Sequence, residues 1–411
     1  MQLPMIKSTI LIFVILIFSC GNQKTDAQDK LSEITSKTES TSAFSKPIVA
    51  ANRIAEYLPL LSNKKIGIVA NQTSVIFNDQ SYTHLVDSLV SLDVNVQKVF
   101  APEHGFRGTA DAGELVKDGI DTKTGIPIIS LYGKNKKPSE TQLANLDILI
   151  FDIQDVGARF YTYISTLHYV MEACAELNLP LIILDRPNPN GHYVDGPILK
   201  LENQSFVGMH PIPIVHGLTI GEYAQMINGE RWLDHQVQCN ITVIKMANYN
   251  RAIIYDLPIK PSPNLPNAKS INLYPSLCFF EGTNVNAGRG TDQQFQIFGS
   301  PYLDKEKYIF TYTPVSNEGA KYPKHNNKLC YGLNLNDSET LNHIKLEWLI
   351  DAYNTTEDKA SFFNDFFVKL SGDETLEKQI KKGLSANEIT KSWQTDLDTF
   401  KEMSSQYMLY N

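Results

Sequence analysis

Six short apolar segments recur along the first 246 residues of this chain, each bounded by polar or turn-forming residues. They are nearly continuous in apolar residues, which is typical of strands in a parallel sheet that is covered on both faces. Helix-like segments lie between several of them. The expected strands are 65–70, 96–101, 126–131, 148–153, 181–185 and 241–246, and the expected helices are 82–92, 160–177 and 219–230.

The alternation of strands and helices runs from residue 48 to about residue 240 and predicts a doubly wound α/β domain. Beyond residue 260 the chain becomes rich in Pro, Asn, Gly and aromatic residues, and a polar region with helical patterns follows. Because single hydrophobic cores stop growing at about 250–300 residues, we expect two domains. The predicted domains are 47–240 (α/β) and 241–411 (a smaller α+β domain), the second with helices at 340–353, 360–370 and 386–403.

The N-terminus has the pattern of an export signal. Lys7 precedes nine consecutive apolar residues at 10–18, a run too short to span a bilayer but suited to a signal peptide. Ser19 and Cys20 follow directly, as in a bacterial lipobox. An ordinary signal peptide with a chance cysteine is the alternative. We expect a membrane-anchored bacterial lipoprotein on the periplasmic or cell-surface side, with a signal peptide over 1–19, a lipidated Cys20 and a disordered tether over 20–46.

The composition and the missing motifs exclude several classes of function. A net charge of −8 argues against a nucleic-acid partner, which would require a basic surface. The sequence has no GxGxxG, Walker A, HExxH or GxSxG motif, and no two of its nine histidines have metal-ligand spacing on a helix. We therefore expect no dinucleotide or NTP in the α/β domain and no pair of histidines that binds a metal from one helix. Five cysteines without a CxxC pair are not a disulfide scaffold, although one disulfide stays open.

Ligands of doubly wound sheets bind outside the carboxyl ends of the strands. Three strand ends here run into polar segments rich in Gly or Pro, at 101–108, 152–159 and 185–191. We expect these segments to converge on one cleft. Three arginines are suited either to bidentate binding of a substrate carboxylate or to ion pairs that staple loops: Arg159, Arg186 and Arg289.

Three glutamates are candidates for acid–base catalysis. Glu103 lies among Pro, His, Gly and Phe residues, an environment suited to a general acid. Its alternative role is a helix cap or an ion pair with Arg107. Glu222 follows Thr219 by three residues, which also fits a capping box, and the alternative for Glu281 is a buried loop anchor.

A series of long motifs resembles one family, the NamZ-type exo-β-N-acetylmuramidases. The motifs occur in order from about residue 48 to the C-terminus. Two positions depart from the family pattern, Asn286 where Ser is frequent and Gln294 where Pro is common, and both leave the three glutamates in place. The motifs are 101–108 (APEHGFRG), 111–114 (DAGE), 124–133, 151–167, 185–191 (DRPNPNG), 195–197, 215–230, 262–266 (SPNLP) and 273–291.

The resemblance implies a Rossmann-like catalytic domain and a smaller C-terminal domain, with the active site in the cleft between them. It implies release of N-acetylmuramic acid (MurNAc) from the non-reducing end of peptidoglycan fragments such as MurNAc–GlcNAc, without a metal or organic cofactor. The expected partners are thus a peptidoglycan-derived disaccharide or muropeptide, and the membrane through Cys20. Glu103 is the expected general acid, and Glu222 the assisting base or nucleophile. The expected substrate-binding residues are His104, Arg107, Asp152, Asp155, Arg159, Tyr163, Asn188, Glu281 and Arg289.

Two other functions are alternatives to the glycoside hydrolase. A non-catalytic lipoprotein that binds muropeptides would need the arginines and aromatic residues but not Glu103. An amidase or esterase acting on the same glycan would need nucleophile or metal motifs that the sequence lacks. For the hydrolase, the retaining, inverting and substrate-assisted routes all stay open, because the first two differ in a carboxyl separation that a sequence does not supply.

Overall fold

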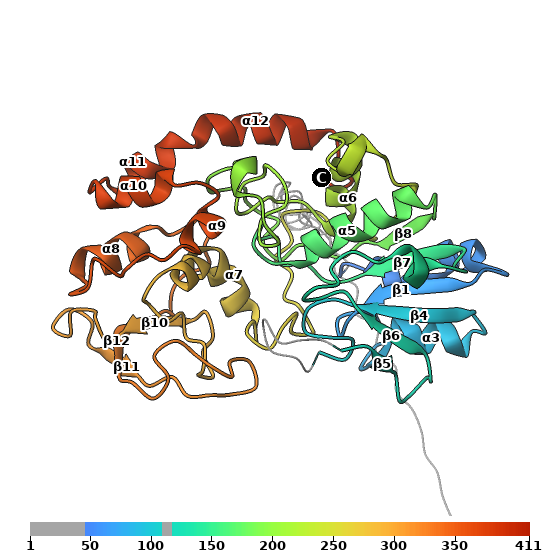
Figure 1. Cartoon of the computed structure of the whole chain (residues 1–411), viewed down its shortest axis with the longest axis horizontal. Helices are drawn as coiled ribbons and strands as arrows, with labels where there is room; N and C mark the ends of the chain where they lie inside the picture. Colours follow the sequence, from blue (N-terminus) through green and yellow to red (C-terminus); the bar gives the residue numbers. More distant parts are fainter. Residues whose placement is uncertain (1–45, 109–116) are drawn as a thin grey trace, which may run out of the picture. The chain divides into compact units, whose positions relative to one another are not determined.

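A computed structural model describes residues 46–108 and 117–411, which therefore exclude the predicted signal peptide, Cys20, all but the last residue of the tether and the 111–114 motif. At its centre is a seven-stranded sheet in the order β5-β6-β4-β1-β7-β8-β9, parallel throughout except for the edge strand β5 (Figure 1). This is the doubly wound sheet that the sequence predicted. Its strands are β1 (Ile66–Ala70), β4 (Val96–Ala101), β5 (Gly119–Ile120), β6 (Pro127–Ser130), β7 (Ile148–Asp152), β8 (Leu181–Leu184) and β9 (Ile241–Ile244).

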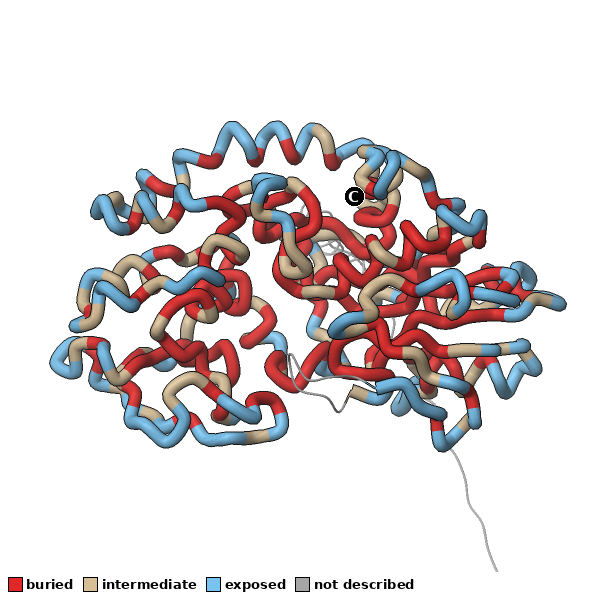
Figure 2. Tube along the Cα trace, viewed as in Figure 1, coloured by how far each residue is buried: buried red, intermediate tan, exposed pale blue. Residues whose placement is uncertain are grey.

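The central strands are buried on both faces, which explains their continuous apolar sequences. Ile68 and Ile150 pack into one hydrophobic cluster, whereas the adjacent Val69 and Phe151 pack into another. Because successive side chains of a strand point to opposite faces, the two clusters lie on opposite sides of the sheet. Figure 2 shows these strands as buried. The main helices of this part are α3 (Leu85–Ser91), α5 (Tyr163–Glu176) and α6 (Ile220–Gly229), with the short α2 (Ile54–Tyr57) and α4 (Glu140–Leu143).

The helix expected at 82–92 begins three residues late. Residues 82–84 form β3 (Tyr82–His84), which pairs with β2 (Val75–Phe77) in a small antiparallel sheet. His84 is extended and caps α3, because its Nδ1 accepts a hydrogen bond from the backbone of Val86. Residues 82–84 therefore belong to a β-hairpin and not to the first turn of the helix.

The sheet also extends past the domain boundary expected at residue 240. Strand β9 begins at Ile241 and pairs in parallel with β8, so the sheet takes in residues that this boundary assigned to the second domain. The reason is that β9 needs a neighbouring strand for its backbone hydrogen bonds, and β8 is the strand that provides them. We call residues 46–267 the first half of the molecule and residues 268–411 the second half.

The second half is a mixed α+β region. A three-stranded antiparallel sheet in the order β10-β12-β11 lies among short helices. The helix expected at 386–403 is broken at Trp393, and the one expected at 360–370 forms only over its last residues. The elements are α7 (Ala268–Leu277), the 3-10 helix η5 (Cys278–Gly282), β10 (Ile297–Ser300), β11 (Phe310–Tyr312), β12 (Cys330–Asn334), α8 (Glu347–Thr355), α9 (Phe367–Ser371), α10 (Thr375–Lys381), α11 (Ala386–Ser392) and α12 (Gln394–Ser405).

The C-terminal residues return to the first half. The Tyr410 hydroxyl donates to Oδ2 of Asp185 at 2.7 Å, and the backbone amide of Leu409 donates to Oε1 of Glu222 at 2.8 Å. Residues 46–411 accordingly form one compact unit. Within the described ranges, no helix has the length and apolar character needed to cross a bilayer. The four cysteines in those ranges are buried, and none of them forms a disulfide.

Candidate active site

Both halves contribute to a pocket of about 150 Å³. The first half supplies the loop after β4, the start of α5 and the segment after residue 261. The second half supplies η5 and the loop that follows it. The lining residues are Glu103, His104, Phe160, Tyr161, Thr162, Tyr163, Val207, Ser262, Asn264, Leu265, Tyr274, Cys278, Glu281, Arg289, Phe295, Phe366 and Leu370.

Glu103 is placed by a tight turn directly after β4. His104 and Gly105 both have positive φ values, 70° and 77°. A left-handed backbone is costly for a residue other than glycine, so the surroundings hold His104 in a strained conformation, as often occurs at functional sites. The turn aims the Glu103 side chain into the pocket mouth while leaving the residue only 9% exposed.

The start of α5 holds the Glu103 carboxyl. Thr162 is the N-cap residue of α5, yet its side chain does not cap the helix. Its hydroxyl instead donates a 2.6 Å hydrogen bond to Oε2 of Glu103. The hydroxyl of Tyr163 lies 3.4 Å from the backbone oxygen of Glu103 and 3.2 Å from that of Pro261. Burial, reinforced by the Glu103 carboxylate, raises the pKa of Tyr163, so this phenol stays protonated.

A second carboxyl, Glu281, enters the pocket from η5. Its Oε2 lies 3.4 Å from Nη1 of Arg289, and both side chains are about a quarter exposed. Arg289 Nη2 also donates to the backbone oxygen of Gly319 at 3.3 Å. This long, partly solvated ion pair leaves both groups within reach of a ligand that enters the pocket.

The two carboxyls both affect the pKa of a neighbouring residue, Tyr274. Burial raises the pKa of Tyr274, and the charges of Glu281 and Glu103 add to that effect. Burial, followed by the Glu281 charge, likewise raises the pKa of Cys278. The Cys278 thiol therefore stays neutral and is not a nucleophile at neutral pH. The ionisable groups of the pocket thus include two carboxyls, Glu103 and Glu281, the Arg289 guanidinium and the His104 imidazole.

Glu222, the expected second catalytic group, does not line this pocket. It is 0% exposed, and Oε2 accepts the backbone amide of Thr219 at 2.8 Å in a capping box. Its other oxygen accepts hydrogen bonds from Arg251 and from the backbone of Leu409. The capping alternative is therefore the one that the structure shows, and it places Glu222 outside the pocket that Glu103 lines.

Two of the expected substrate-binding arginines are engaged elsewhere. Arg107 contacts Asp121 at 2.8 Å and Asp87 at 3.2 Å, so it staples loops outside the pocket. Arg159 is fully buried and donates to the backbone oxygens of Pro197, Ile212 and Leu370 at 2.7–2.8 Å. Burial lowers the pKa of Arg159 to about 9. Neither guanidinium lines the pocket, because backbone or carboxylate acceptors already hold it.

Three further expected residues brace the strand ends. Asp152 forms a buried bidentate pair with Arg186, at 2.6 and 2.8 Å. Asp155 accepts the backbone amide of Gly157 at 2.7 Å, and Asn188 donates to the backbone oxygen of Leu218 at 2.9 Å. None of them lines the pocket. The strand-end segment 185–191 thus does not join the pocket, whereas the β4 loop does.

The structure therefore brings together five of the expected residues: Glu103, His104, Tyr163, Glu281 and Arg289. It adds residues that the sequence did not single out as ligand contacts, above all Thr162, Asn264 and Tyr274. The SPNLP motif around Asn264 was the available signal for that residue. In the part of the chain that the structure describes, no group of three or more His, Cys, Asp or Glu side chains is arranged to hold a metal.

Known proteins match this chain over most of its length. Family models described as exo-beta-N-acetylmuramidase NamZ, N-terminal and C-terminal, match residues 66–269 and 272–410. Peptidoglycan beta-N-acetylmuramidase NamZ from Bacillus subtilis (strain 168) is 38% identical over 379 residues, which cover 87% of this chain and 89% of that protein.

Two solved structures have the same architecture. One is a crystal structure of a DUF1343 family protein from Bacteroides fragilis NCTC 9343, with 47% identity and a TM-score of 0.82. The other, a second DUF1343 family protein from the same organism, has 27% identity and a TM-score of 0.75. Each match covers 89% of this chain and 99% of the solved chain. The mixed α/β architecture with two successive parts is therefore shared along almost the whole described chain.

Proposed function

This chain belongs to the NamZ exo-beta-N-acetylmuramidase family, and we propose that it releases MurNAc from the non-reducing end of peptidoglycan fragments such as MurNAc–GlcNAc. Membership makes it a glycoside hydrolase of the peptidoglycan muramidase kind. The observation that carries the finer proposal is the meeting of Glu103 and Glu281 in one pocket built by both halves.

Glu103 is proposed as the general acid. In the protonated form it gives its proton to the glycosidic oxygen while the bond from that oxygen to the anomeric carbon breaks. Thr162 fixes the carboxyl through the 2.6 Å hydrogen bond, so the proton donor needs no rearrangement. Apolar and aromatic walls around the carboxyl, among them Phe160 and Leu265, keep bulk water away from the reacting bond.

Glu281 is proposed as the second carboxyl, in the place first expected for Glu222. As a base it takes a proton from the water that attacks the anomeric carbon; as a nucleophile it forms a glycosyl ester that water then hydrolyses. If the acetamido oxygen of the sugar attacks instead, Glu281 orients that group. The anomeric configuration of the released MurNAc separates the inverting route from the other two.

Arg289 is proposed to bind the lactyl carboxylate of MurNAc. Its guanidinium lines the pocket, and its Nη1 lies 3.4 Å from Oε2 of Glu281. A planar guanidinium can bind a second carboxylate through its fork of N–H donors. Binding of the lactyl group would thus place the sugar ring next to both glutamates and would select MurNAc over N-acetylglucosamine.

The test is product release from MurNAc–GlcNAc, followed by mass spectrometry, for the wild type, Glu103→Gln, Glu281→Gln and the surface control Glu202→Gln. General acid–base catalysis contributes about 10²–10⁴-fold, so both pocket variants should lose that much activity and the control should lose none. Full activity of Glu103→Gln would refute the assignment of the acid. A wild type that binds the disaccharide without releasing MurNAc would instead be a muropeptide-binding protein.

We also propose that the protein is a lipoprotein anchored through Cys20, with the enzyme facing the periplasm or the cell surface. The apolar run at 10–18 and the Ser19–Cys20 pair support this proposal. Metabolic labelling with a fatty acid should mark the wild type and not Cys20→Ser. The variant should also leave the membrane fraction. Equal labelling of both proteins would exclude Cys20 as the anchor.

A further inference from the structure

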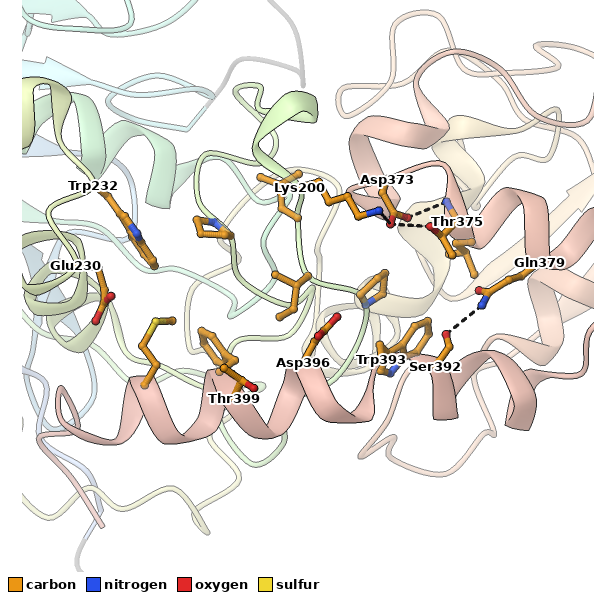
Figure 3. Close-up of a pocket in the computed structure, with 17 residues that line it drawn as sticks. Lys200, Glu230, Trp232, Asp373, Thr375, Gln379, Ser392, Trp393, Asp396 and Thr399 are labelled. Atoms are coloured by element: carbon orange, nitrogen blue, oxygen red, sulfur yellow. Dashed lines mark hydrogen bonds and ion pairs between the residues drawn. The ribbon is translucent and has the colours of Figure 1, made fainter.

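A second and larger cavity, of about 650 Å³, lies beside α12 (Figure 3) and shares no lining residue with the pocket of the two glutamates. Its size is in the range of cavities that bind small organic ligands. It is lined by the segment 197–200, the end of α6, the start of α10 and one side of α12. The residues that matter for its chemistry are Lys200, Glu230, Trp232, Asp373, Asp396 and Phe400.

One indole face is directed to this cavity. The ring of Trp232 stacks on His210, with centroids 4.6 Å apart and planes 17° apart. Burial, followed by the charge of His168, lowers the pKa of His210, so the ring behind the indole is neutral. Figure 3 shows the Trp232 side chain pointing into the cavity, which Phe400 of α12 also lines. An indole face of this kind attracts cations as well as apolar groups.

The charge of the cavity is negative. Three carboxylates line it, Glu230, Asp373 and Asp396, against the one cation Lys200. Lys200 Nζ is already 3.0 Å from Asp373. Burial alone would raise the pKa of Asp373, but the hydrogen bonds from Lys200 and Thr375 lower it. Besides this ion pair, two further carboxylates line the cavity, Glu230 and Asp396.

Among the described residues, neither remaining carboxylate has a basic side chain within ion-pair distance, and Asp396 interacts with Lys200 only at longer range. Glu230 accepts a 2.7 Å hydrogen bond from the neutral hydroxyl of Tyr407, and burial together with Glu230 raises the pKa of that hydroxyl to about 12. Asp396 is exposed, and Figure 3 shows its side chain pointing from the cavity-facing side of α12 into the cavity. A ligand with a positive charge would complement both carboxylates and the indole, whereas an anionic sugar would be repelled.

We propose that this cavity is an accessory site for a peptide that carries a primary ammonium group, namely the peptide substituent of a peptidoglycan fragment. The choice of occupant rests on the proposed function, because such peptides are the amine-bearing part of that polymer, while its muramic acid carboxylates are anionic. The ammonium group lies between Asp396, Glu230 and the Trp232 face. The site holds the polymer while the glutamate pocket acts on a glycan end.

Calorimetric titration with L-Lys-D-Ala-D-Ala tests the proposal, with the same tripeptide acetylated on both amino groups as the uncharged probe. The wild type should bind the amine form and not the acetylated form. Asp396→Asn and Glu230→Gln should each weaken binding about three- to fivefold, and 0.5 M salt should weaken it further. The matched control is Asp398→Asn, an exposed α12 carboxylate that does not line the cavity and pairs with Lys401 at 3.6 Å.

The proposal is overturned if the wild type does not bind the amine tripeptide, if the acetylated form binds equally well, or if Asp398→Asn weakens binding as much as Asp396→Asn. The same proteins are assayed for MurNAc release from a disaccharide without peptide, which the cavity variants should leave unchanged. Loss of tripeptide binding with intact MurNAc release refutes the accessory site alone. Tripeptide binding without MurNAc release refutes the proposed substrate of the pocket alone.

Discussion

The hydroxyl of Thr162 donates to Oε2 of Glu103 across 2.6 Å, so the residue that begins α5 holds the carboxyl that follows β4. An N-cap hydroxyl usually accepts a hydrogen bond from a backbone amide in the first turn of its own helix. Here no such bond forms, and the hydroxyl serves the pocket. This arrangement makes Thr162 a positioning residue for the proposed acid.

Thr162→Val should lower kcat about 10- to 100-fold, because a hydrogen bond to an ionisable group contributes about 1.5–3 kcal/mol. The fold should stay intact, since valine is isosteric and the lost hydroxyl does not cap α5. Thr162→Ser should restore most of the rate. The measurement is kcat and KM on MurNAc–GlcNAc, with the exposed Thr395→Val as control. An unchanged kcat in the valine variant would show that the bond does not matter for turnover.

Arg159→Met should destabilise the protein by at least about 3 kcal/mol, because three buried carbonyl oxygens lose a donor and those of Pro197 and Leu370 are left without one. The expected observation is a lower midpoint of urea unfolding at an unchanged slope. Arg231→Met, at an exposed position, is the comparison and should cost less than about 0.5 kcal/mol. Similar midpoints for the two variants would mean that solvent satisfies the three carbonyls.

Stability should fall as the pH rises from about 4 to above 7, because of Asp185. Burial, opposed by the Tyr410 hydroxyl and reinforced by the Glu222 charge, raises the pKa of Asp185 to about 7. A carboxyl with a raised folded-state pKa contributes stability below its unfolded pKa and loses it as the pH passes the folded one. The slope is at most about 1.4 kcal/mol per pH unit for one group. Thermal unfolding between pH 4 and 8.5 measures it, and Asp185→Asn should flatten the curve.

Gly282→Ala should disturb η5 and with it Glu281. A Cβ at Gly282 would lie 2.5 Å from the Cα of Phe367, which belongs to α9 and is backbone that cannot step aside. We expect a loss of about 1–3 kcal/mol in stability and a reduced kcat. Gly119→Ala is the matched control, because nothing lies within 4 Å of its Cβ position. Equal effects of the two substitutions on MurNAc release would argue against support of Glu281 by α9.

Local patterns predicted the sheet well, because its strands carry their own signal. Ile68 and Val69 lie back to back in two cores, and only a strand covered on both faces needs such continuous apolar residues. The capping box of α6 is equally local, since Thr219 and Glu222 are one helical turn apart. The helix at 82–84 was mispredicted because the pairing of β3 with β2 overrides local preference.

The site was harder to predict, because a polar residue at a strand end looks the same whether it binds substrate or braces a loop. Arg159 and Arg289 are both arginines in Gly-containing segments, yet one is sealed among carbonyls and the other lines the pocket. Only the packing of segments distant in sequence decides between these roles. Glu103 and Glu281 line the same pocket although they lie 178 positions apart in the sequence.

Arg159 also has a consequence for how the pocket fills. Its guanidinium bonds to Pro197 and Ile212 in the first half and to Leu370 in the second. Swinging the halves apart would strip a buried cation of its acceptors, a costly step in an apolar interior. We therefore expect the pocket to be preformed, without a hinge motion that closes it. The rate of turnover should then be limited by substrate binding and product release and not by movement of the two halves.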